Sequence, residues 1–197
     1  MTSIHDYAST ATPGRALFLA LWIFVFILLE ACSLLISPSQ VIGALFQMGT
    51  MFPYAMMTIG YYNLLRGVNK YAMRAFGAFN ALGVVIQLCS IPDLLEISPD
   101  VHGYEIGQIV AEILMCIAIF ILVQVMSKSP LVPHLFAYAY GIFGIFWLLA
   151  LWLWVAYPHR SIFDPPTYIS GWIAQGGFAL FLTAWGLKKH RQHVRGK

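Results

Sequence analysis

The sequence predicts an all-α fold, a polytopic membrane protein built as a bundle of six transmembrane helices. Composition is the first reason: 60% of the 197 residues are hydrophobic and 10% are charged, whereas a soluble domain is about 45–50% apolar and about 25% charged. The hydrophobic fraction amounts to about 118 residues, close to what six spans of about 20 residues require. The mean hydropathy of +0.76 agrees. This composition excludes a soluble globular enzyme.

Six apolar runs separated by helix-breaking residues give the number of spans. The runs cover residues 15–36, 41–65, 75–91, 105–126, 134–157 and 167–187. Prolines follow or precede the runs at Pro38, Pro92, Pro130, Pro133, Pro158, Pro165 and Pro166. We expect the third span to stop at Pro92, because proline cannot continue the hydrogen-bond ladder of a helix. Pro53 lies inside the second run, where neighbouring groups can satisfy the carbonyl that it frees.

The basic residues predict the orientation of the six spans. Ten of the eleven Lys and Arg residues fall on one side of the membrane, namely Arg15, Arg66, Lys70, Arg74, Lys128, Lys188, Lys189, Arg191, Arg195 and Lys197, and only Arg160 falls on the other. Short loops that are rich in Lys and Arg remain cytoplasmic. We therefore expect a disordered cytoplasmic tail over residues 1–13, a six-helix transmembrane domain over 14–187, and a basic cytoplasmic tail over 188–197. The expected location is a bacterial inner membrane or its equivalent.

Two acidic residues lie inside the predicted spans, and they are the main candidates for function. Glu30 is about six residues, or about 9 Å, from the outer end of the first span, and Glu112 is about 10 Å from the outer end of the fourth. An ionisable group in hydrocarbon costs at least about 2.5 kcal/mol, so such groups tend to serve a function. Because both lie at a similar depth, the two carboxyl groups could face one cavity.

Further polar residues accompany this pair in the outer half of the bundle. Glu105, Gln108 and Glu112 follow one another at helical spacing and form a polar stripe on the fourth span. Gln87 on the third span and Gln175 on the sixth also fall in the outer half of the bilayer. We predict an outward-facing polar pocket that binds a substrate or a proton through these side chains. The alternative is that they only hydrogen-bond neighbouring helices, which is worth about 0.6–2 kcal/mol each.

No metal site and no cofactor are expected from the sequence. The acids of the loop between the third and fourth spans match no ligand spacing, and helix capping by Ser98 with Pro99 at the first helical position accounts for them. An aromatic stripe on the fifth span is formed by Phe136, Tyr140, Phe143 and Trp147. We interpret this stripe as lipid contact, with a groove for a flat or lipidic ligand as the alternative.

The leading functional hypothesis is a small integral membrane carrier or binding protein for a proton, a cation or a small cationic solute. One alternative is a non-catalytic accessory subunit of a larger membrane complex, which short loops and the lack of cofactor ligands favour. Another is an intramembrane acid–base enzyme acting on a lipid or isoprenoid-like substrate, although the sequence favours a protein that is not an enzyme. Expected partners are the lipid bilayer, anionic lipids at the basic tail, and a membrane protein or a second copy, but no nucleic acid.

The charge asymmetry makes the topology testable. A reporter fused to the C-terminus should be active in the cytoplasm, and a reporter inserted near Asp100 should be active on the outer side. A C-terminal reporter that is active outside the cytoplasm would contradict the predicted orientation.

Overall fold

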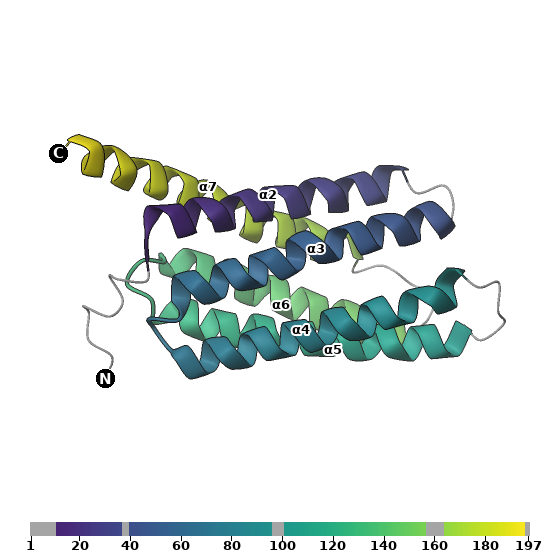
Figure 1. Cartoon of the computed structure of the whole chain (residues 1–197). Helices are drawn as coiled ribbons and strands as arrows, with labels where there is room; N and C mark the ends of the chain where they lie inside the picture. Colours follow the sequence, from purple (N-terminus) through teal and green to yellow (C-terminus); the bar gives the residue numbers. More distant parts are fainter. Residues whose placement is uncertain (1–10, 37–39, 96–100, 157–163, 196–197) are drawn as a thin grey trace.

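The computed structural model describes residues 11–36, 40–95, 101–156 and 164–195, and every element in them is helical. In chain order the helices are α2 (Pro13–Ile36), α3 (Gln40–Leu65), α4 (Lys70–Leu95), α5 (Val101–Ser127), α6 (His134–Ala156) and α7 (Asp164–Arg195). Figure 1 shows the six helices lying side by side with roughly aligned axes. The predicted all-α fold with six helices is confirmed.

Several boundaries differ from the sequence prediction. Helix α4 continues past Pro92 to Leu95, because a proline in the last turn removes one hydrogen bond without ending the helix at once. Helix α7 extends through most of the predicted basic tail, to Arg195. The predicted disordered tail overlaps α2, which begins at Pro13, and its residues 1–10 lie outside the described residues. The predicted cap at Ser98 and Pro99 also lies outside them.

Four helices are long and apolar enough to cross a membrane within the part of the chain that the structure describes. They contain the segments Pro13–Cys32, Lys70–Cys89, Ile106–Ser127 and His134–Leu153, from α2, α4, α5 and α6. Helices α3 and α7 do not reach the same hydropathy, because they carry more Gly, Ser, Thr, Gln and Tyr residues. Four such helices are compatible with a multi-pass membrane protein.

The six helices form a closed ring. Each packs against the helix before it and the helix after it in the chain, and α2 packs against α7. Chain direction alternates around the ring, so one end holds the start of α2 and the end of α7 (Figure 1). We call it the basic end, because the Lys and Arg side chains that the structure describes belong to it: Arg15, Arg66, Lys70, Arg74, Lys128, Lys188, Lys189 and Arg191. The opposite end is called the far end.

Residues at alternating spacings of three and four line the inside of the ring. This spacing keeps side chains on one face of a helix that packs against neighbours at a shallow angle. On α2 the stripe is Ala16, Leu19, Ile23, Phe26 and Glu30, and on α4 it is Met73, Phe76, Asn80, Gly83 and Gln87. On α5 it is Gln108, Glu112, Met115, Ile119, Leu122 and Met126. Each stripe is apolar toward the basic end and carries polar residues toward the far end.

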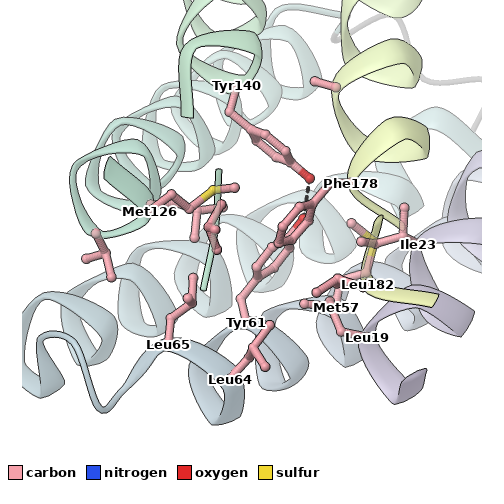
Figure 2. Close-up of a cluster of buried hydrophobic side chains, with 14 of the residues drawn as sticks. Leu19, Ile23, Met57, Tyr61, Leu64, Leu65, Met126, Tyr140, Phe178 and Leu182 are labelled. Carbon is pink, nitrogen blue, oxygen red and sulfur yellow. Dashed lines mark hydrogen bonds between the residues drawn. The ribbon is translucent and has the colours of Figure 1, made fainter. Parts of the chain in front are cut away.

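The half of the ring nearer the basic end is a packed apolar core. Figure 2 shows its centre, where the hydroxyl groups of Tyr61 on α3 and Tyr140 on α6 form a hydrogen bond. The ring of Phe178 from α7 stacks on Tyr61, with the two planes 4° apart. Fully buried side chains around them include Leu19, Ile23, Leu64, Leu65, Met126 and Leu182. Since α3 and α6 are opposite members of the ring, the tyrosine pair shows that opposite helices meet inside the ring.

Glycines allow close approach at defined points of the ring. A Cβ atom added to Gly60 of α3 would lie 2.9 Å from Leu19 Cδ1 and 3.3 Å from Leu19 Cα of α2. The second neighbour is backbone, so it cannot rotate away, and the two helices would have to separate. Gly77 of α4 has no atom within 4 Å of the same position.

These two glycines form a matched pair for a stability test. Both Gly60→Ala and Gly77→Ala gain about 0.5–1 kcal/mol of helix propensity, but only Gly60→Ala also incurs an overpacking cost of about 1–3 kcal/mol. We expect Gly60→Ala to lower the thermal midpoint in detergent and Gly77→Ala to keep or raise it. Equal midpoints for the two variants would contradict the close contact between α2 and α3.

Candidate functional site

The carboxyl group of Glu112 on α5 lies inside the ring and is held by two donors. The indole Nε1 of Trp147 on α6 donates a hydrogen bond of 2.5 Å to Glu112 Oε2. The side chain of Gln108, one turn away on the same helix, also hydrogen-bonds the carboxyl group. Hydrogen bonds to a charged acceptor are about twice as strong as neutral ones. Glu112 therefore has a fixed position between α5 and α6.

Glu30 on α2 is held in the same way by a second tryptophan. The indole Nε1 of Trp172 on α7 donates a hydrogen bond of 2.6 Å to Glu30 Oε2. One turn closer to the basic end, the side chain of Ile27 on α2 faces Gly176 of α7, so the two helices are in contact beside this bond. Two glutamates on two helices are thus each oriented by an indole from a neighbouring helix.

The two carboxyl groups come from opposite members of the ring, α2 and α5. Glu30 has an electrostatic influence on Glu112, which is smaller than the effects of burial and of the hydrogen bonds from Trp147 and Gln108. The hydroxyl group of Tyr54 on α3 also interacts with Glu112, and it donates a hydrogen bond of 2.8 Å to Asn80 Oδ1 on α4. Polar groups from several helices therefore meet inside the ring, between the apolar core and the far end.

Gln87 and Gln175 are buried, and their amide oxygens have no partner within the described part of the chain. Gln87 is 6% exposed and Gln175 is 7% exposed, and neither Oε1 atom has a hydrogen-bond partner among the residues that the structure describes. Gln87 continues the inner stripe of α4, and Gln175 lies on the buried face of α7, one turn from Trp172. A buried acceptor left unpaired costs about 1–3 kcal/mol, so these two oxygens need an explanation beyond packing.

The remaining predicted site residue is Glu105. It belongs to the first turns of α5, and its side chain lies outside the described residues. Among the side chains that the structure describes, no group of three or more His, Cys, Asp or Glu residues is placed to hold a metal ion. Glu30, Glu112, Gln108, Gln87 and Gln175 remain the described members of the predicted set, and we call these five residues the polar cluster.

Sequence reasoning missed the tryptophan partners of both glutamates. The aromatic stripe of α6 was interpreted as lipid contact, and that interpretation is wrong. Tyr140 and Phe143 are buried, Phe136 packs on Phe178, and Trp147 bonds Glu112. The position of each residue along its helix could have indicated the Trp–Glu pairs. A Trp inside a bundle needs an acceptor for its N–H, and Trp172 lies about as far from the far end as Glu30 does.

Comparison with known proteins adds no assignment to this geometry. The chain matches no protein-family model, no curated protein and no solved structure.

The two indole–carboxyl bonds give the polar cluster an optical readout. Indole emission depends on the charge beside the ring, so a pH titration of tryptophan fluorescence in nanodiscs should show a transition when the carboxyl groups ionise. We expect Glu112→Gln to remove the part due to Trp147, Glu30→Gln to remove the part due to Trp172, and the double variant to remove both.

Two further variants assign the signal. Trp147→Phe should lose the same component as Glu112→Gln, while Trp185→Phe on α7 should keep the full transition. A transition of wild-type size in the double glutamate variant would contradict the coupling between the indoles and the carboxyl groups.

Proposed function

We propose that the chain crosses the membrane six times, with the basic end in the cytoplasm, most simply in a bacterial inner membrane. Helix α3 carries the chain from the end of α2 to the start of α4, and α2 and α4 run in the same direction. If α2 and α4 both span, α3 has to return across the bilayer. Both α3 and α7 also present large apolar side chains outward, among them Phe52, Ile59, Ile173 and Leu180, and such a surface suits lipid.

Within that membrane the protein acts as a small carrier that binds a proton or a small cation at Glu30 and Glu112. The observation that supports this role is the placement of two carboxyl groups from opposite helices in one interior, each oriented by an indole donor. Ionisable residues that face the interior of a membrane bundle mark ion and proton pathways. A purely structural pair of helix contacts would be served as well by uncharged side chains.

The packing also favours access from one side. The polar cluster lies between the apolar core and the far end, and the core around Tyr61, Tyr140 and Phe178 fills the ring toward the basic end. With the basic end in the cytoplasm, this packing supports entry of a cation from the outer side. Delivery to the cytoplasm then requires the tyrosine contact to open.

Glutamine variants test the carrier role. In proteoliposomes with an entrapped pH dye and an imposed gradient of Na⁺, K⁺ or methylammonium, the wild type should change the internal pH with at least one of these ions. Glu30→Gln and Glu112→Gln keep shape and hydrogen bonding but cannot ionise, so each should lose at least about tenfold of the flux. The double variant should be no worse than either single variant, because residues that act as one unit are not additive.

The matched control is Asp6→Asn, a change of the same kind in the N-terminal tail, which should keep the wild-type flux. Wild-type flux in both glutamate variants would contradict the carrier proposal. Such a result, with the chain recovered in a stoichiometric complex from the membrane, would instead favour the accessory-subunit hypothesis.

A further inference from the structure

The cyclic order of the ring pairs like residues across its axis. Helices α2 and α5 are opposite, and each contributes a glutamate, Glu30 and Glu112. Helices α4 and α7 are opposite, and each contributes a glutamine, Gln87 and Gln175. The two glutamates and the two glutamines therefore come from four different helices of the ring.

The four residues lie at similar depth along the ring. Trp172, which bonds Glu30, is one turn from Gln175 on α7. On the other side, a Cβ atom on Gly83 would lie 3.2 Å from the carbonyl oxygen of Ala111, next to Glu112 in the chain. Gln87 is one turn from Gly83 toward the far end. This position on α4 is level with the turn of α5 that holds Gln108 and Glu112. Counted along the helices, the two pairs therefore lie at similar depth.

All four groups are hydrogen-bond acceptors, and this property defines the ligand. An ionised carboxylate only accepts, and it offers about four positions. Trp147 and Gln108 bond Glu112, and Trp172 bonds Glu30. The Oε1 atoms of Gln87 and Gln175 are buried and unpaired among the described residues. A ligand that satisfies this arrangement carries positive charge together with several N–H donors that point in different directions.

We propose that the polar cluster binds a guanidinium-type cation, with Glu30 and Glu112 as the charged acceptors and Gln87 and Gln175 as the neutral ones. This inference rests on the proposed function and specifies its substrate class. A guanidinium group is planar, presents N–H donors around its whole edge, and is more weakly hydrated than an ammonium ion, so less is lost when it leaves water. Its flat faces also suit the aromatic neighbours Trp147 and Phe143, whose ring centroids are 5.2 Å apart.

Other cations fit the same residues less well. A proton alone would neutralise a carboxyl group and leave the oxygens of Gln87 and Gln175 unpaired. A tetraalkylammonium ion would satisfy the charge but has no N–H to donate. The two glutamines therefore distinguish the guanidinium class from each of these.

The test measures equilibrium binding of radiolabelled guanidinium to the full chain in nanodiscs at constant ionic strength. Guanidinium should bind, and tetramethylammonium should compete at least about tenfold less well. Gln87→Met and Gln175→Met remove one neutral acceptor each while keeping side-chain length. A hydrogen bond to a charged group is worth about 1.5–3 kcal/mol, so each variant should weaken binding by roughly ten- to hundredfold.

Thermal stability separates a ligand-binding glutamine from a structural one. Because the oxygens of Gln87 and Gln175 have no partner in the described part of the chain, both Met variants should keep or raise the thermal midpoint in the absence of guanidinium. A structural glutamine would lower it. The control is Gln124→Met, the same change at an exposed position of α5, which should leave guanidinium binding unchanged.

Two results would overturn the inference: equal binding of tetramethylammonium and guanidinium, or Met variants of Gln87 and Gln175 that bind guanidinium like the wild type. Either result would leave the carrier role intact if Glu30→Gln and Glu112→Gln still abolish the ion-driven change of internal pH. If those glutamate variants keep wild-type flux, the carrier proposal itself fails, whatever guanidinium does.

Discussion

The contact between α2 and α7 is the constraint on which the rest of the molecule depends. It joins the first and last helices of the described chain and turns a row of six antiparallel neighbours into a ring. Only in a closed ring does each helix have an opposite member, so only there can Glu30 approach Glu112 and Tyr61 reach Tyr140. The bond between Trp172 and Glu30 lies at this same contact. The contact that closes the ring therefore also determines the geometry of the polar cluster.

Closure also explains how polar groups persist inside an apolar bundle. Transmembrane helices gain little from the hydrophobic effect on association, so packing and interhelical hydrogen bonds hold them together. In this ring, apolar side-chain packing holds the half nearer the basic end, where aromatic rings and leucines fill the centre. The half nearer the far end contains interhelical hydrogen bonds, namely the two indole–carboxyl bonds and the bond between Tyr54 and Asn80. The two halves differ in chemistry, although one continuous stripe on each helix supplies both.

The sequence was sufficient for the parts of the structure that depend on local pattern. Apolar runs and prolines gave the six helices, and the rarity of charge within those runs gave Glu30 and Glu112. Spacing alone placed Gln108 on the same face as Glu112, and the structure joins the two by a hydrogen bond. Helix ends were less predictable, because Pro92 in a last turn is tolerated and because Lys188 to Arg195 continue α7 beyond the apolar run.

The order of helices around the ring could not be obtained from the sequence. Without that order, the hydrogen-bond partners of the two glutamates could not be predicted either. Periodicity shows which face of a helix is buried but not which helix covers it, so the stripe containing Trp147 was assigned to lipid. Gln87 and Gln175 were selected for their polarity and depth, yet their positions on opposite helices follow only from the cyclic contacts. Which helices pack together depends on the buried faces of all six helices at once, not on the sequence of any single helix.

The hydrogen bond between Tyr61 and Tyr140 has a consequence for the width of the interior of the ring. Two opposite helices are connected through two side chains placed end to end, so the length of a pair of tyrosines sets the diameter of the ring at that level. Helices are stiff, and this diameter is therefore transmitted along α3 and α6 to the walls of the polar cluster. The tyrosine pair therefore acts as a spacer between α3 and α6, and the residues at these two positions influence the width of the interior at the level of the polar cluster without belonging to it.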